Sequence, residues 1–568
     1  KTFLYLIPVG IGALAKPPAV MFAPILFFYI TLFEKKLSLT DFFRAANFKQ
    51  VGKSILEVIP AFVFCGLMYW WVDKFTPHTW QAGGNSPLLY LITQPFVIGY
   101  YFVTLFFPIH LSADTDWQLL SNIWNIRFFI GCVFIVLMLW VAIFTSKKTT
   151  TRPISFGILW FFLALIPTSS IIPLAEVMND HRMYFPFVGL ILSVIWTIGL
   201  ILMKYQTFYQ KYATFIFSGI GIILVAYAVG TYQRNKVWAT EETLWYDVTV
   251  KSPGNSRGLM NYGLSKMGKG EYTEADKYFT QALVLAPDYP TLHINMGVLK
   301  EATGDKLNAE QYFKSALAAN SLTAEPWFFY GRFLFNQLRY SEASPYLSKA
   351  IEISPAYLPA RELLMKIYDQ QEDFAKLKAL AESTLQIAPA SIDAQLFKQS
   401  AELRKSQLAL QRDEVSKNPS PEKFLNLGLA YYQVGKYKES IEVNSEAIQL
   451  NPDYAEAYNN IGSAYNLLKE YDKAQEYLKK AIQLKPDFQL AKNNLAVAEN
   501  SINEVGNAEK LAQQKPSPEN YISLSLVYFN HNMFEKCIEA CKKALTLKPD
   551  YDLAYNNICA AYNRLKQW

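Results

Sequence analysis

The chain is poor in the residue patterns from which soluble enzymes build active sites. Five cysteines and five scattered histidines occur among 568 residues, and their spacing matches no established Cys/His metal-binding motif. It has no glycine-rich loop suited to phosphate and no Ser/His/Asp order. Cys537, Cys541 and Cys559, with His531 nearby, could form a metal site or a disulfide. Because Cys537 and Cys541 are four residues apart on an expected helix, we interpret them instead as small buried side chains.

The sequence also lacks a basic stripe with interleaved aromatic residues, so nucleic acid is not an expected partner. The formal net charge of +6 is unevenly distributed. Residues 1–230 contain 15 Lys and Arg against 8 Asp and Glu, whereas the remainder contains 39 against 40. The excess positive charge therefore belongs to the apolar half, where basic residues set the orientation of membrane segments.

The first 230 residues predict a multi-spanning membrane domain in contact with the lipid bilayer. A spanning helix needs about 20 mostly apolar residues. The candidate spans are 56–72, 127–145, 153–168, 185–203 and 213–230. Segment 3–33 is also apolar, but Lys16, Pro17 and Pro18 interrupt it. Since proline removes a backbone donor and clashes with the preceding turn, we expect two segments with a break.

The Lys and Arg content of the loops predicts an orientation. The basic loops, assigned to the cytoplasmic side, are 34–55, 146–152 and 204–212. The loops poorer in positive charge, assigned to the outside, are 73–88, 110–126 and 169–184. Segment 89–109 then has both flanks outside and cannot cross, so its prolines and glycine predict a re-entrant or interfacial helix pair. The last span leaves the C-terminal domain outside the cytoplasm.

From about residue 256 the sequence repeats with a period of 34 residues, which is typical of stacked helical hairpins. One slot holds Gly263, Gly297, Gly331, Gly428 and Gly462, and an aromatic slot holds Tyr431, Tyr465, Tyr528 and Tyr562. This pattern resembles the tetratricopeptide repeat (TPR). Small residues let the two helices approach, an aromatic fills the gap, and proline ends the second helix. Residues 357–384 are degenerate, and proline spacing twice widens to 63 residues.

The predicted fold is therefore all-α: a polytopic transmembrane helical domain (1–230), a linker (231–255) and a TPR α-solenoid (256–568). Stacked hairpins form a concave surface that binds extended peptides or partner proteins. Asparagines on the first helices are candidates for that groove: Asn261, Asn295, Asn426, Asn459, Asn460 and Asn494. The alternative for each is a solvated or helix-packing position.

A group of ionisable residues lies between two strongly apolar segments, at 171–189. It contains Glu176, Asp180, His181 and Arg182 and is closed by Tyr184. Charged side chains at a membrane domain are costly, which makes this cluster a candidate functional site.

Four segments of the chain occur in an order that resembles a known family. They are LAKPPAVMFAPILFFY (14–29), FFPIHLSADTD (106–116), IPTSSIIPLAEVMNDHRMYFPFVGL (166–190) and TYQRNKVWATEETLWYDVTVKSPGNSRGLMNYG (231–263). With the repeats, this order is similar to the transmembrane and TPR-containing protein O-mannosyltransferases of the GT-C glycosyltransferase superfamily. The resemblance implies sugar transfer from a polyprenyl-phosphate donor on the outer or luminal face. It places the acidic catalytic motif in a first extracytoplasmic loop that we expect to precede residue 1, so no catalytic residue is assigned.

Given such a donor, physical requirements suggest residue roles. The leaving phosphate gains negative charge as the glycosidic bond breaks, and a guanidinium offers paired planar donors. Arg182 is therefore the first candidate for donor phosphate binding, with His181 as helper. Lys16 is either a second phosphate contact or a side chain that snorkels to the interface.

The acidic residues have more than one interpretation. Glu176 and Asp180 would orient Arg182 or meet sugar hydroxyls, and Tyr184 is grouped with them, although a ring at interface depth needs no ligand. Asp114 and Asp116 would bind acceptor or a divalent cation, the alternative being a solvated loop.

Two other functions stay open: a non-catalytic scaffold of an envelope or secretion complex, and a transporter or flippase for a lipid-linked sugar. Both ends of the chain are expected to be cut, because residue 1 opens directly into an apolar run and residue 568 falls inside a repeat. The composition of the repeats suits a bacterial protein, whose repeats would lie in the periplasm.

Overall fold

The computed structural model describes residues 3–75, 86–170, 174 and 176–566. The described part has 27 α-helices, short 3-10 and π-helical turns and no strand, which confirms the predicted all-α class. The chain divides into two compact units, Lys1–Ala319 and Asn320–Trp568. Each is described by itself.

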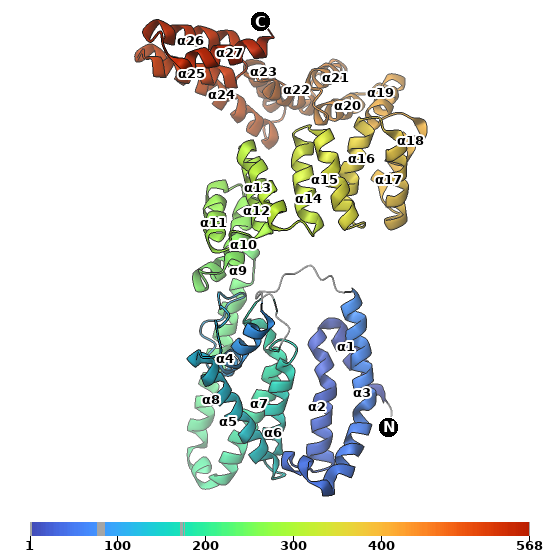
Figure 1. Cartoon of the computed structure of the whole chain (residues 1–568), viewed down its shortest axis with the longest axis vertical. Coiled ribbons are helices and arrows are strands. Elements are labelled where there is room, and N and C mark those ends of the chain that lie inside the picture. Colours follow the sequence, from blue (N-terminus) through green and yellow to red (C-terminus); the bar gives the residue numbers. More distant parts are fainter. Residues whose placement is uncertain (1–2, 76–85, 171–173, 175, 567–568) are drawn as a thin grey trace. The chain divides into compact units, whose positions relative to one another are not determined.

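The first unit contains the apolar helices and the first repeats (Figure 1). Its helices are α1 (Leu6–Ala15), α2 (Phe22–Tyr29), α3 (Phe48–Phe75), α4 (Pro87–Phe106), α5 (Ile126–Ser146), α6 (Arg152–Leu165), α7 (Tyr184–Lys204), α8 (Gln206–Val237), α9 (Glu241–Lys251), α10 (Ser256–Gly268), α11 (Tyr272–Leu285), α12 (Pro290–Ala302) and α13 (Lys306–Ala319). The end of α8 and the whole of α9 occupy the segment assigned to a linker.

Five helices of the described residues, α3, α4, α5, α7 and α8, are long and apolar enough to cross a membrane. They indicate a membrane protein, and four of the predicted spans lie within α3, α5, α7 and α8. The predicted span 153–168 is wrong in length, because α6 has only 14 residues. At 1.5 Å per residue it extends about 21 Å, less than the roughly 30 Å of a hydrocarbon core.

The predicted break in segment 3–33 is confirmed. Lys16 adopts an extended backbone (φ −150°, ψ 124°) between α1 and the 3-10 turn Pro17–Met21, which leads into α2. Proline at the first position of that turn needs no backbone donor, so the chain can restart its helix there.

Helix α4 corrects the prediction of a helix pair, because segment 89–109 forms one helix with Pro95 inside it. The first turn of this helix and the segment that follows it both contact the loop between α6 and α7. Tyr90 Oη donates to Thr168 O (2.7 Å), and beyond α4 Thr115 Oγ1 donates to Met178 O (2.9 Å). That α4 does not cross the membrane stays a prediction, and its 20 residues are long and apolar enough for a span.

Two of the loops predicted to be cytoplasmic contact each other beside the C-terminal end of α5. Arg152 Nε donates to Ser146 O (3.1 Å), and Leu39 N donates to Ser146 Oγ (3.1 Å). Loops 34–55 and 146–152 are therefore neighbours, as the orientation requires.

Glycines allow close approach of helices in the apolar half. A Cβ added to Gly157 in α6 would lie 2.3 Å from Gly189 O in α7. Such contact of backbones is typical of membrane helices that pack through small residues.

The second unit continues the repeats. Its helices are α14 (Ala324–Asn336), α15 (Tyr340–Ile353), α16 (Leu358–Gln370), α17 (Phe374–Ile387), α18 (Ile392–Leu403), α19 (Gln407–Lys417), α20 (Pro421–Gln433), α21 (Tyr437–Leu450), α22 (Ala455–Leu468), α23 (Tyr471–Leu484), α24 (Gln489–Gln514), α25 (Pro518–Asn530), α26 (Phe534–Leu547) and α27 (Asp552–Leu565). The degenerate stretch 357–384 still forms the pair α16 and α17. The two wide proline spacings differ in structure, since one contains the short pair α18 and α19 and the other contains the single long helix α24.

The recurring glycines of the repeats allow the two helices to pack closely, as predicted. The residue that packs against each glycine, however, is not the predicted tyrosine. A Cβ on Gly263 would lie 2.6 Å from the Phe279 ring, and one on Gly462 would lie 2.5 Å from Leu478. The gap is thus filled by the residue sixteen positions later, on the second helix, rather than by the tyrosine slot. That residue is Phe or Leu in four repeats and Asn444 opposite Gly428.

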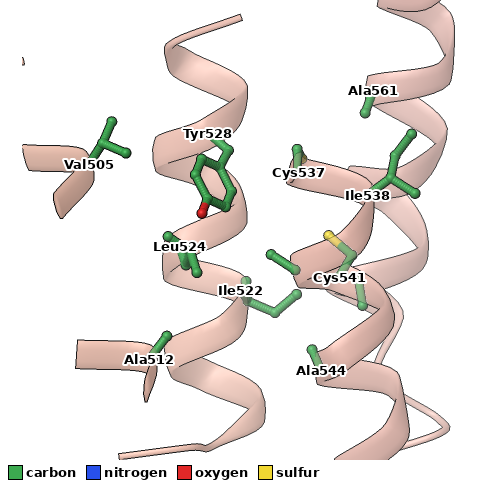
Figure 2. Packing of buried hydrophobic residues seen from close by; sticks show 12 residues of the cluster. Val505, Ala512, Ile522, Leu524, Tyr528, Cys537, Ile538, Cys541, Ala544 and Ala561 are labelled. Atoms are coloured by element: carbon green, nitrogen blue, oxygen red, sulfur yellow. The ribbon is translucent and has the colours of Figure 1, made fainter. Parts of the chain in front are cut away.

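Figure 2 shows the packing around two of the three C-terminal cysteines. Cys537 and Cys541 are fully buried in the core of α25 and α26, beside Leu524 and Ile538. His531 lies against a different group, with its Nε2 3.1 Å from Glu504 Oε2. The interpretation of these thiols as small buried side chains is confirmed.

Candidate functional site

Three segments meet where α10 begins. They are 111–116 after α4, 176–182 before α7, and 251–257 from the last residue of α9 to the first turn of α10. Asn255 caps α10 by accepting a hydrogen bond from Gly258 N (2.7 Å), and its amide donates to Thr115 O (2.9 Å). Lys251 Nζ donates to Leu111 O (2.9 Å). The first repeat is therefore attached to the loop that follows α4.

Arg257, in the first turn of α10, joins the other two segments by ion pairs. Its Nε donates to Asp114 Oδ2 at 2.7 Å, and its Nη2 contacts Glu176 Oε1. Glu176 uses its other oxygen, Oε2, to bind Arg182 Nη2 at 2.5 Å. Two carboxylates and two guanidinium groups thus alternate in an ion-pair chain, Asp114–Arg257–Glu176–Arg182, that carries no net charge.

The carboxylates of this ion-pair chain are largely buried, with side-chain exposures of 4% for Asp114 and 10% for Glu176. Burial by itself raises the pKa of Glu176. The hydrogen bond from Arg257 and the charges of Arg182 and Arg257 outweigh it, so the pKa of Glu176 lies below its ordinary value. Burial likewise opposes the charge of Arg257, yet Asp114 and Glu176 raise its pKa overall. Glu176 and Arg257 are therefore charged at neutral pH.

Asp180 lies beside the ion-pair chain, at the start of a 3-10 turn before α7. Its Oδ2 accepts a hydrogen bond from Ser112 N (3.2 Å), whereas its Oδ1 is buried without a hydrogen-bond partner in the described part of the chain. Burial raises the pKa of Asp180, against the effects of the Ser112 hydrogen bond and of Arg234 and Lys251. A buried unsatisfied carboxylate oxygen is costly, and a ligand hydroxyl would satisfy it.

The structure brings only part of the predicted site together. Arg182 and Glu176 bind each other, as an orienting role for Glu176 requires. Tyr184, the first residue of α7, is 85% exposed, so its grouping with the cluster is not supported. Lys16 is exposed at the break after α1, and among the described residues no hydrogen bond or ion pair links it to the cluster. The side chain of His181 lies outside the described residues.

Asp114 and Asp116 have protein partners rather than a shared open face. Asp114 pairs with Arg257, and Asp116 Oδ2 accepts a hydrogen bond from Gly254 N (3.2 Å). Within the described ranges, no group of three or more His, Cys, Asp or Glu side chains is placed to hold a metal ion. A divalent cation at this pair stays a prediction.

Arg257 is the member of the ion-pair chain that the sequence motifs do not single out. It lies 81 residues beyond Glu176, within the segment 231–263 that contributes to the family resemblance. One local signal was available: a cation in the first turn of a helix opposes the helix dipole, and such a residue needs a carboxylate partner.

The asparagines proposed for the groove differ in their surroundings. Asn459 is buried, with 2% exposure, and accepts a hydrogen bond from Asn494 Nδ2 (2.9 Å). Asn494 also donates to Ser463 Oγ (2.7 Å). These bonds link α22 to α24, which supports the helix-packing alternative for this pair. Asn426 is exposed, and the side chains of Asn261, Asn295 and Asn460 are partly buried. A peptide contact for these four stays a prediction.

The fold and this site describe a class: an all-α chain with apolar, membrane-length helices followed by helical repeats. Models of the tetratricopeptide repeat match residues 260–321, 294–357, 455–488 and 518–551, and a further TPR model matches 428–468. The TPR assignment is therefore confirmed over these residues.

Curated relatives lie among the protein O-mannosyl-transferases. The chain is 26% identical over 155 residues to Tmtc3 of Drosophila melanogaster, which is 27% of this chain and 16% of that protein. It is 23% identical over 244 residues to TMTC1 of Mus musculus, 39% of this chain and 25% of that protein. The resemblance to the TPR-containing O-mannosyltransferases is confirmed, although the chain spans a quarter or less of the length of these relatives.

Among solved structures, the chain is similar to YrrB, described as a TPR protein with an unusual peptide-binding site. The identity is 17%, the match covers 44% of this chain and 96% of that chain, and the TM-score is 0.21. The TPR assignment therefore depends on the matches to the repeat families and on the paired helices, and not on this structural similarity.

Proposed function

We propose that the chain is part of a membrane glycosyltransferase of GT-C type that uses a polyprenyl-phosphate-linked sugar as donor. Similarity to protein O-mannosyl-transferases supports the reaction class. The observation that carries the proposal is the ion-pair chain, because Glu176 is shared between Arg182 of the loop and Arg257 of the first repeat.

In this proposal Arg182 binds the donor phosphate and Glu176 orients it. Arg182 contacts Glu176 through Nη2, and a guanidinium carries five N–H donors on three nitrogens. A guanidinium held on one edge by a carboxylate presents its other donors in a fixed plane, which suits phosphate oxygens. The developing charge of the leaving phosphate would then be met by a group that needs no reorganisation. Asp180 Oδ1 would accept a hydrogen bond from a hydroxyl of the sugar.

In this proposal the repeats recruit the acceptor protein. Stacked hairpins bind extended peptides and partner proteins, and the first turn of α10 contains Arg257, which holds Asp114 and Glu176. A protein acceptor recruited by the repeats would therefore be delivered beside the donor site. We place both on the extracytoplasmic side, which in a bacterium is the periplasmic face of the inner membrane.

Label transfer from polyprenyl-phosphate sugars to protein tests the proposal. Arg182→Ala should abolish transfer, and Arg182→Lys should restore only part of it, because an ammonium lacks the paired donors. Arg412→Ala is the matched control, since Arg412 is exposed on α19 in the second unit. Transfer that persists in Arg182→Ala would remove Arg182 from the site.

A non-catalytic scaffold is the second candidate. The mutual neutralisation of the four charges favours it, because an ion-pair chain that only attaches the first repeat to the loops needs no ligand. This function predicts no transfer with any donor, with partner proteins still bound to the repeats. The same assay, with a co-purification arm, separates the two.

A further inference from the structure

A hollow is lined by residues of α4, of the segment that follows it and of the start of α5. Its volume is about 670 Å³, within the range of roughly 300–1,000 Å³ that is typical of ligand sites. Ten residues form this lining. Neither Arg182 nor Glu176 is among them, so the hollow is separate from the proposed phosphate site.

Three aromatic rings form one part of the lining. Trp117 stacks on Phe96, with ring centroids 5.7 Å apart, and meets Tyr100 edge-on at 5.0 Å. Leu120 N donates to Thr93 Oγ1 (2.9 Å), which fixes the segment against α4. These contacts fix the orientation of the Trp117 indole.

Polar groups form the rest of the lining. Asp116 contributes a carboxylate that is anchored through Oδ2 by Gly254 N (3.2 Å). Arg127 contributes a guanidinium 5.6 Å from the centre of the Phe96 ring. The amides of Gln118 and Asn125 complete the set. One carboxylate and one guanidinium leave the lining without net charge.

We propose that this hollow is a binding site for an uncharged sugar unit, with Trp117 as the stacking surface and Asp116 as the hydroxyl acceptor. A purely apolar ligand would leave Asp116 and Arg127 desolvated and unpaired, which is costly. An anionic ligand attracted by Arg127 would meet the carboxylate of Asp116. A pyranose presents C–H faces to the rings and hydroxyls to the carboxylate and amides, and therefore satisfies both parts of the lining.

The proposal goes beyond the transferase function, because it assigns a separate sugar-binding site and its test requires no transfer. The full chain in nanodiscs would be examined by saturation-transfer NMR with methyl glucoside, mannoside and galactoside as probes. Saturation should reach the ring protons of at least one pyranoside. Trp117→Ala should reduce that signal by about tenfold or more, the usual effect of losing an aromatic anchor.

Trp124→Ala is the matched control, because Trp124 lies in the same segment, is 82% exposed and does not line the hollow. It should keep the wild-type signal. Asp116→Asn, which keeps an oxygen for Gly254 N, should weaken binding without loss of the fold and serves if Trp117→Ala aggregates. The proposal is overturned if no pyranoside receives saturation, if Trp117→Ala or Asp116→Asn binds like wild type, or if inorganic phosphate displaces the sugar. Transfer activity without pyranoside binding would reject this site alone.

Discussion

Replacement of Arg257 by alanine should weaken the attachment of the first repeat to the loops that follow α4 and α6, although Lys251, Gly254 and Asn255 keep their bonds to residues 111–116. Arg257 is the only residue of α10 in the ion-pair chain, and its removal leaves Asp114 without that guanidinium. Asp114 keeps the hydrogen bond from Thr115 N (2.9 Å), and Glu176 keeps Arg182. The loss therefore falls mainly on one buried carboxylate.

The expected magnitude follows from burial. Removal of one partner from a fully buried ion pair costs about 3–5 kcal/mol. The side chain of Arg257 is 35% exposed, against 4% for Asp114, so solvent screening reduces the expected cost to roughly 2 kcal/mol. Asp114→Ala removes the charge that needs pairing, and the double variant should be little worse than either single one. The coupling free energy should be about 1–2 kcal/mol.

Proteolysis of the full chain over a urea series, with cleavage in α9 and α10 read by mass spectrometry, measures this local opening free energy. Arg412→Ala should stay within about 0.5 kcal/mol of wild type, as expected for an exposed side chain. Additive effects of the Arg257 and Asp114 substitutions would refute the ion-pair chain as a unit.

Three further predictions concern stability. The pKa of Glu176 is depressed by its arginine partners, so its contribution to stability is present above the ordinary pKa of 4.5 and is lost as pH falls through the lower pKa of the folded state. Glu176→Gln should flatten this loss of stability in acid in the same proteolysis assay. Burial raises the pKa of Asp369 from 3.8 to about 6, so its contribution is lost as pH rises between these values. Asp369→Asn should therefore gain roughly 2 kcal/mol relative to wild type from pH 4 to 7 in urea titrations, and an unchanged difference would contradict this. Gly157→Ala should force α6 from α7 and cost about 1–3 kcal/mol in detergent unfolding, whereas Gly199→Ala, with open space around its Cβ, should be neutral.

Local chemistry made part of the site predictable. Glu176, Asp180 and Arg182 lie within seven residues of one loop, and the cost of charge beside apolar helices marks them without any structure. Asp114 was recognised as a candidate, but not its partner. The Asp114–Arg257 contact joins residues 143 positions apart, and nothing in a local pattern specifies which distant cation reaches a given carboxylate.

The errors in the predicted fold also arise from relying on local patterns. Hydropathy detects apolar length but not where a helix ends, which is why segment 153–168 became the shorter α6. Segment 89–109 was expected to break at its prolines and glycine, whereas the helix continues through Pro95. The tyrosine slot was mistaken for the filler of the glycine gap, because periodicity shows recurrence and only packing shows which side chain faces the gap.

Composition and period by themselves determined that this protein is all-α, that its first half is apolar enough for a membrane and that its second half is a TPR array. These properties are sums over neighbouring residues, and backbone geometry converts them directly into helices and faces. Only the tertiary structure decided that Arg257 joins Asp114 to Glu176 and that Trp117 and Asp116 line one hollow. Those contacts depend on how segments far apart in sequence pack, and the free energy that selects them belongs to no single segment.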